Sequence, residues 1–142
     1  MRGNDKRGSV PAFSTKLILD WRGWWGEGPP YHAPVFVLTN HERAPLAMQG
    51  GTTLTFVTDG IRSALRQGKA AAGGGSAGIH GGANVVRQYL QAGLIDELGL
   101  NIAPVVLGTG ERLLNGLVDL RLEPLATRHS PLVTHLRYRG VK

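Results

Sequence analysis

The stretch of residues 78–90 places the strongest constraint on how this chain can fold. It combines a short apolar segment, the glycine pair Gly81 and Gly82, and an amphipathic segment that contains Tyr89. This order predicts a buried strand over residues 77–80, a tight turn, and a helix with one apolar side. A strand that leads directly into a helix is typical of α/β domains.

The glycine pair itself leaves two interpretations open. Gly81 and Gly82 permit a backbone path without Cβ atoms, and the free N–H groups at the start of the following helix suit a phosphate or another anion. The same pair also fits an ordinary strand-to-helix turn that binds nothing. These residue types alone do not separate the two, so the decision depends on the rest of the chain.

Two further strands and a helix are predicted before this stretch. Residues 35–39 are continuously apolar and rich in β-branched side chains, as in a central strand buried on both faces. Residues 53–59 form a second strand, and Asp59 is predicted to cap a helix that runs to Ala72. Residues 1–20 show weak periodicity and are expected to form an irregular arm.

The C-terminal third predicts strands with few helices. Residues 98–107 alternate as a long strand, with an edge position or a bulge at Pro104. Residues 121–127 and 132–139 form a hairpin. The chain is therefore predicted to be an α/β sandwich with a mostly parallel mixed sheet and a C-terminal antiparallel hairpin.

Composition excludes several classes of protein. The 142 residues suit one domain and contain no cysteine, so disulfides and thiolate metal sites are excluded, and the five histidines lack metal-ligand spacing. No apolar run approaches the roughly 18 residues of a membrane span, and no secretory signal is found, so a cytoplasmic protein is expected. The net charge of +6 comes from scattered basic residues, so nucleic-acid binding is not expected.

Polar or glycine residues follow each of the parallel strands. Thr39-Asn40, Asp59-Gly60 and Gly81-Gly82 come directly after the three predicted strands. Because ligands bind at the carboxyl ends of parallel strands, these turns predict a nucleotide site that is neither a Rossmann motif nor a P-loop. No nucleophile, acid/base pair or proton donor can be named, which matters less if a bound cofactor supplies hydride.

Several segments resemble the bacterial RibD C-terminal / dihydrofolate reductase-like family. They are Pro-Val-Phe-Val-Leu-Thr at 34–39, Thr-Phe-Val-Thr-Asp-Gly-Ile at 55–61, Gly-Gly-Ala at 81–83, Tyr-Leu-Gln-Ala-Gly-Leu-Ile-Asp-Glu-Leu at 89–98, Pro-Val-Val-Leu-Gly-Thr-Gly-Glu-Arg-Leu at 104–113, and Val-Thr-His-Leu-Arg-Tyr-Arg at 133–139. The resemblance extends over residues 21–138. It implies a dihydrofolate reductase-like three-layer sandwich for residues 21–142, and an NADPH-dependent oxidoreductase of a small heterocyclic or carbonyl substrate, as in riboflavin biosynthesis.

The resemblance also implies roles for individual residues. The turn at Thr39-Asn40 would lie near the adenosine 2′-phosphate, and Asp59 and Ile61 would flank the adenine. The segment 81–85 would hold the pyrophosphate, with the Gly81–Gly82 peptide in the cis form. The residues implied to bind the cofactor are Leu38, Thr39, Asn40, Asp59, Ile61, Ile79, Gly81, Gly82, Ala83, Asn84 and Val85.

The start of the chain departs from the family pattern. The N-terminal strand of the family, and its substrate-side helix with a Gly-Arg motif, are not found before residue 21. The chain is therefore expected to be a shortened member. The alternative hypothesis is a non-catalytic, dinucleotide-binding or dimeric fold remnant, since an open position in the sheet would favour pairing with a second copy as a homodimer.

Overall fold

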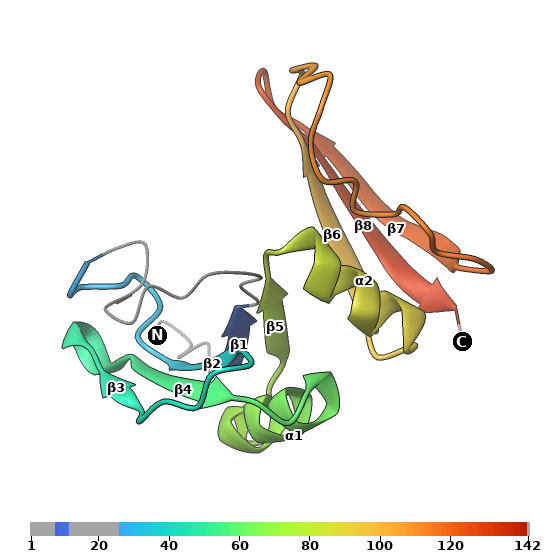
Figure 1. The fold of residues 1–142 in the computed structure, drawn as a ribbon. Coiled ribbons are helices and arrows are strands. Elements are labelled where there is room, and N and C mark those ends of the chain that lie inside the picture. Colours follow the sequence, from blue (N-terminus) through green and yellow to red (C-terminus); the bar gives the residue numbers. More distant parts are fainter. Residues whose placement is uncertain (1–7, 12–25, 142) are drawn as a thin grey trace. The chain divides into compact units, whose positions relative to one another are not determined.

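The computed structural model describes residues 8–11 and 26–141, which fall into two compact units, 1–85 and 86–142 (Figure 1). The first unit contains a five-stranded sheet in the order β3-β4-β2-β1-β5. Strands β1, β2, β4 and β5 run parallel, and β3 is antiparallel to β4. The strands are β1 Gly8–Pro11, β2 Pro34–Leu38, β3 Leu46–Ala47, β4 Thr53–Val57 and β5 Ala77–His80.

The core of the first unit occupies both faces of its sheet. Val35 and Val37 are buried with Leu54 on one face. On the other face, Phe36 and Val57 pack with Ala64 of helix α1, Ile61–Ala72. The prediction of a strand buried on both faces at residues 35–39 is confirmed, with the strand ending at Leu38.

Strand β1 corrects the expectation of an irregular arm over residues 1–20. Gly8–Pro11 lies between β2 and β5 and pairs parallel with both (Figure 1). A strand therefore does precede residue 21, and it fills an interior position of the sheet. The sequence reasoning missed it because four residues, Gly-Ser-Val-Pro, are too few to show an alternating pattern. The remainder of the arm lies outside the described residues.

The two ends of helix α1 depend on glycine. The helix begins after Gly60, which has φ 91° and ψ 179°, and no side chain caps its first turn. The prediction that Asp59 is the N-cap is therefore wrong, because the cap position adopts a conformation that is open essentially to glycine alone. The predicted glycine stop is confirmed, since Gly73 takes the left-handed conformation with φ 55°.

The second unit contains a three-stranded antiparallel sheet in the order β6-β8-β7. Its strands are β6 Glu97–Ile102, β7 Arg121–His129 and β8 Thr134–Val141. The predicted C-terminal hairpin is confirmed by the pairing of β7 with β8. It forms a second sheet with β6, whereas the sequence predicted that it would sit at the edge of one mixed sheet.

Strand β6 is shorter than predicted. It ends at Ile102, and residues 103–120 follow without a helix or a strand. Pro104 explains the early end, because proline has no N–H to donate to a sheet and restricts the residue before it.

Helix α2, Ala83–Gln91, joins the two units in sequence. Its predicted apolar side is confirmed in that Val85, Tyr89 and Leu90 are buried. None of the helices in residues 26–141 is long and apolar enough to cross a membrane.

Candidate cofactor site

The parallel strands of the first unit all end at the same side of the sheet, which is called here its carboxyl edge. In the parallel register, Leu38 at the end of β2 lies beside Val57 at the end of β4, and Pro11 at the end of β1 lies beside His80 at the end of β5. The turns after β2, β4 and β5 therefore leave the sheet at the same edge. All eleven residues implied to bind the cofactor belong to this unit.

The turn after β2 is held by its own hydrogen bonds. The Thr39 N–H donates to the Val57 carbonyl at 3.1 Å, and Thr39 Oγ1 accepts the His41 N–H at 3.1 Å. A hydroxyl that accepts one bond can still donate its own proton. Asn40 is exposed beside it, so this turn presents two polar side chains at the edge of the sheet.

A positive charge that the sequence reasoning missed lies close to this turn in sequence. Arg43 is half-buried, and its guanidinium lies 4.9 Å from the centroid of the Phe56 ring. Stacking on an aromatic face holds a guanidinium in place, so its positive charge has a fixed position. No sequence motif marks Arg43, and only the fold brings it over Phe56 of the neighbouring strand.

Two helices begin at this edge of the sheet. Helix α1 follows β4, and Ala83, the first residue of α2, follows the turn after β5, so each helix begins beyond the carboxyl end of a parallel strand. The first turn of α1 carries no acidic residue and no side-chain cap, and the first turn of α2 also lacks an acidic residue. The first turns of both helices therefore contain no acidic side chain that would repel an anion.

The glycine pair forms a tight turn without a cis bond. Gly81 has φ 85° and Gly82 has φ 67°, and no cis peptide bond occurs in residues 8–11 and 26–141. The expectation of a cis Gly81–Gly82 peptide is therefore wrong, because two successive positive φ values turn the chain with trans peptides. A Cβ built on Gly81 would meet nothing within 4 Å, so the backbone here faces open space.

A ring pair covers part of the sheet face opposite helix α1. Gly78 lies beside Ser9, which lies beside Val35, so Gly78 and His80 share the face of Val35. A Cβ on Gly78 would meet His80 Nε2 at 2.7 Å, which shows that the imidazole leans over this glycine. The Tyr31 ring lies 5.9 Å from it at an interplanar angle of 47°. In the sequence, this contact is indicated only by the Gly-x-His spacing, which places Gly78 and His80 on the same face of a strand.

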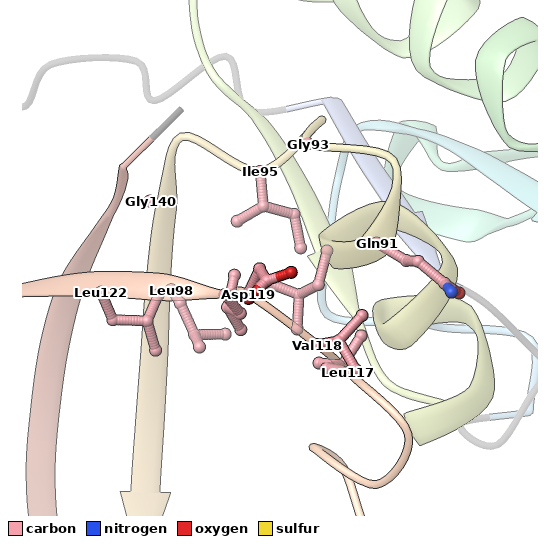
Figure 2. Close-up of a pocket in the computed structure, with 11 residues that line it drawn as sticks. Gln91, Gly93, Ile95, Leu98, Leu117, Val118, Asp119, Leu122 and Gly140 are labelled. Atoms are coloured by element: carbon pink, nitrogen blue, oxygen red, sulfur yellow. The ribbon is translucent and has the colours of Figure 1, made fainter.

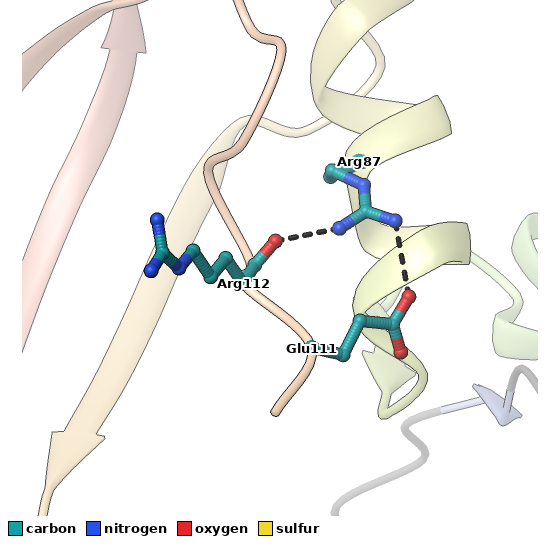
Figure 3. Close-up of polar contacts among 3 residues, drawn as sticks. All are labelled: Arg87, Glu111 and Arg112. Atoms are coloured by element: carbon teal, nitrogen blue, oxygen red, sulfur yellow. Dashed lines mark hydrogen bonds and ion pairs between the residues drawn. The ribbon is translucent and has the colours of Figure 1, made fainter. Parts of the chain in front are cut away.

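Arg87 of helix α2 anchors the long segment after β6 (Figure 3). Its guanidinium donates to Glu111 Oε1 at 3.0 Å and to the Arg112 carbonyl oxygen at 2.5 Å. The side chain is 23% exposed, so this pair is better shielded from water than the other ion pairs of the second unit. In the sequence, Arg87 is one of many scattered basic residues, and no motif distinguishes it.

Burial also affects one ionisable group on α2. Tyr89 is fully buried, and burial raises the pKa of its hydroxyl to about 12. The phenol is therefore neutral at physiological pH and acts as part of the core. Over the described ranges 8–11 and 26–141, no group of three or more histidine, aspartate or glutamate side chains is placed to hold a metal ion.

These features define an α/β protein in which turns and helix N-termini lie at the carboxyl ends of parallel strands. The residues present suit a dinucleotide cofactor, because the backbone at Gly81 faces open space and the guanidinium of Arg43, stacked on Phe56, carries a positive charge. The sequence profile of the RibD C-terminal domain matches residues 13–135, and the chain belongs to this family. The family consists of NAD(P)H-dependent pyrimidine reductases.

Similar solved structures agree with this assignment at the level of the fold. A putative riboflavin biosynthesis protein from Shewanella sp. PV-4 has a TM-score of 0.67 and 23% identity, over 94% of this chain and 73% of that one. RibD from Acinetobacter baumannii has a TM-score of 0.62 and 18% identity, over 96% of this chain and 47% of that one. The riboflavin biosynthesis reductase Rib7 of Saccharomyces cerevisiae has a TM-score of 0.54 and 18% identity, over 77% and 56%.

The chain thus spans about half the length of the Acinetobacter RibD that it matches. No curated protein sequence shows significant similarity to it.

Proposed function

We propose that this chain binds NADPH at the carboxyl edge of its parallel sheet and reduces a small heterocyclic or carbonyl substrate. The observation that carries the proposal is that the Gly81-Gly82 turn and the starts of two helices without acidic first turns all follow the carboxyl ends of parallel strands. Membership of a reductase family that uses NADPH supports the choice of cofactor. We also propose that the complete domain forms the dihydrofolate reductase-like three-layer sandwich.

Each part of this edge would hold a different part of the cofactor. The N–H groups of the segment 81–85 would bind the pyrophosphate, and Arg43 with the Thr39 hydroxyl would bind the 2′-phosphate. Asp59 and Ile61 would flank the adenine, with Leu38, Asn40 and Ile79 beside them. The bound cofactor would supply hydride, and the chain's own residues would orient it and hold its phosphates.

The test is a fluorescence titration of the purified chain with NADPH. Gly82→Asp places a carboxylate at the proposed pyrophosphate position and is expected to weaken binding about 30-fold. Gly74→Asp is the matched control, because Gly74 also has a positive φ of 91° and is exposed, but lies after the C-terminal end of α1. Failure of the unaltered chain to bind NADPH saturably would refute the proposal.

A second variant tests the phosphate assignment. Arg43→Gln is expected to weaken NADPH about tenfold and to leave NADH unchanged, because only NADPH carries the 2′-phosphate. Equal losses for both cofactors would show that Arg43 supports the fold and does not read the phosphate.

The alternative function is a non-catalytic dinucleotide-binding or dimeric protein, and one observation favours the dimer. Ile102, Val105, Val106, Leu107 and Leu132 are large apolar side chains that remain exposed in the second unit. Large apolar side chains that stay exposed are typical of surfaces that meet a partner when they lie together. We propose a homodimer in the cytoplasm, to be tested by light scattering. A monomer at micromolar concentration would refute the dimer without affecting NADPH binding.

A further inference from the structure

The second unit contains a cavity that the proposed function does not use (Figure 2). Its volume is about 270 Å³, and it lies between the C-terminal end of α2, the start of β6 and the segment before β7. None of its lining residues belongs to the candidate cofactor site. Its walls are mainly aliphatic, from Leu90, Ile95, Leu98, Leu117, Val118 and Leu122.

One charged group faces this apolar space. Asp119 is the only ionisable residue among those that line the cavity, and Figure 2 shows its carboxylate among the aliphatic side chains. Within the part of the chain that the structure describes, this carboxylate has no hydrogen-bond or ion-pair partner. Its backbone has φ 56°, a conformation that aspartate and asparagine adopt more readily than other residues with side chains.

The end of helix α2 adds negative potential at the same place. Gln91, the last residue of α2, and Gly93, which follows it, both line the cavity. The N–H groups of Gly93 and Leu94 bond to the carbonyls of Leu90 and Tyr89, which closes the helix at this point. The C-terminal end of a helix carries a partial negative charge and favours cations. The cavity therefore combines two sources of negative potential in a chain whose net charge is +6.

We propose that this cavity binds a small amphipathic cation, that is, a primary ammonium group attached to an aliphatic or aromatic body. The ammonium would pair with the Asp119 carboxylate, and the apolar body would contact Leu98, Leu117 and their neighbours. A volume of about 270 Å³ lies just below the usual range of ligand pockets, about 300–1,000 Å³, so the ligand is a small molecule. Charge complementarity selects a cation over an anion or a neutral molecule of the same shape.

The test uses three probes that share a phenyl ring and differ in charge. The full chain, labelled with ¹⁵N, is titrated with 2-phenylethylammonium, 2-phenylethanol and 3-phenylpropanoate, and amide shifts are followed. The ammonium is expected to bind at least tenfold more tightly than the alcohol, with the largest shifts at Gln91, Gly93 and Asp119. The carboxylate probe is expected not to bind. Equal binding of all three probes, or shifts confined to other residues, would overturn the proposal.

Two variants, each with a matched control, test the contacts. Asp119→Asn removes the charge and suits the same backbone conformation, so it is expected to weaken the ammonium about fivefold, whereas Glu42→Gln, an exposed acid of the first unit, should change nothing.

Val118→Lys places a tethered ammonium beside Asp119 and is expected to abolish binding. Val118 is 80% exposed, so the variant should fold, and Leu114→Lys at a 45% exposed position outside the cavity is its control. Unchanged binding in Asp119→Asn or Val118→Lys, or no saturation up to about 10 mM probe, would refute the site.

Discussion

Strand β2 of the first unit and strand β7 of the second unit differ in how much of their surface is buried. In β2, the three central residues Val35, Phe36 and Val37 are all buried, so both faces of the strand are covered. In β7, none of the nine residues is fully buried, and exposed positions dominate. A continuous apolar run in the sequence therefore predicts β2, whereas β7 has only a few partly buried positions on one face and gives a weaker sequence signal.

The two sheets also differ in how their exposed groups are satisfied. The second sheet carries ion pairs between strands, Arg137 with Glu97 and Arg139 with Glu123, all more than half exposed. The first unit instead places its polar groups in turns at the strand ends. The first sheet therefore owes its stability mainly to burial, and the polar face of the second contributes solubility more than stability.

The largest difference in stability is expected between two valine-to-alanine variants, one at a buried position and one at an exposed position. Val37→Ala, at 1% exposure in the first sheet, is expected to lower the free energy of unfolding by about 2–3 kcal/mol. Val106→Ala, at 95% exposure in the second unit, is expected to cost less than about 0.5 kcal/mol in the monomeric chain. Urea denaturation of both variants measures the difference. A large cost at Val106 would show that a partner chain covers it.

Burial in the second unit is tested by Tyr89 of helix α2, which is fully buried. Because the pKa of its hydroxyl rises from 10.0 to about 12 on folding, the unfolded chain ionises first as the pH rises. The resulting stability is present below pH 10 and is lost between pH 10 and about 12, to an extent of about 2–3 kcal/mol.

The measurement is urea denaturation of the unaltered chain and of Tyr89→Phe across this pH window. The variant should lack this part of the alkaline loss. An identical pH dependence in both proteins would mean that the phenol is accessible to water.

A smaller effect is expected at the anchor between α2 and the segment after β6. Arg87→Met retains the aliphatic stem but removes both hydrogen bonds, with an expected loss of about 1 kcal/mol. Hydrogen exchange at residues 108–112 should become faster. Arg112→Gln is the control, since Arg112 contributes only its carbonyl oxygen to the anchor. Equal exchange in both variants would exclude the anchor.

The smallest effect is expected on the polar face of the second sheet. Arg139→Gln breaks the exposed pair with Glu123 and is expected to cost less than about 0.5 kcal/mol. Thermal unfolding in low and high salt measures this loss, which salt should reduce further. A loss above about 1 kcal/mol would show that this face is covered rather than solvated.

Patterns that repeat along the chain predicted most of the fold. The apolar run at 35–39, the strand at 77–80 and the helix that buries Tyr89 were each predicted close to their observed bounds. Strand β1 was not, because its neighbours in the sheet, rather than its own four residues, select its conformation. Asp59 is not the cap because Gly60 occupies the N-cap position, in a backbone conformation that helix-capping preferences do not take into account.

The candidate site was predictable only in its backbone. Glycines and strand ends are visible in a sequence, so the Gly81-Gly82 turn could be placed before the structure was known. Arg43 over Phe56 and the Tyr31–His80 pair depend on contacts between segments far apart in the chain, and no local pattern encodes such contacts. The roles of all these residues in cofactor binding stay predictions.

The position of β1 sets the order in which the first sheet can form. Gly8 pairs with Ala77, about 70 residues later in the chain. On a ribosome, where the N-terminal residues emerge first, β1 therefore gains its second neighbour only after most of the unit has been synthesised. Closing so long a loop favours slow folding, so the β1–β5 pairing is expected to form late, after β2, β4 and α1 have assembled.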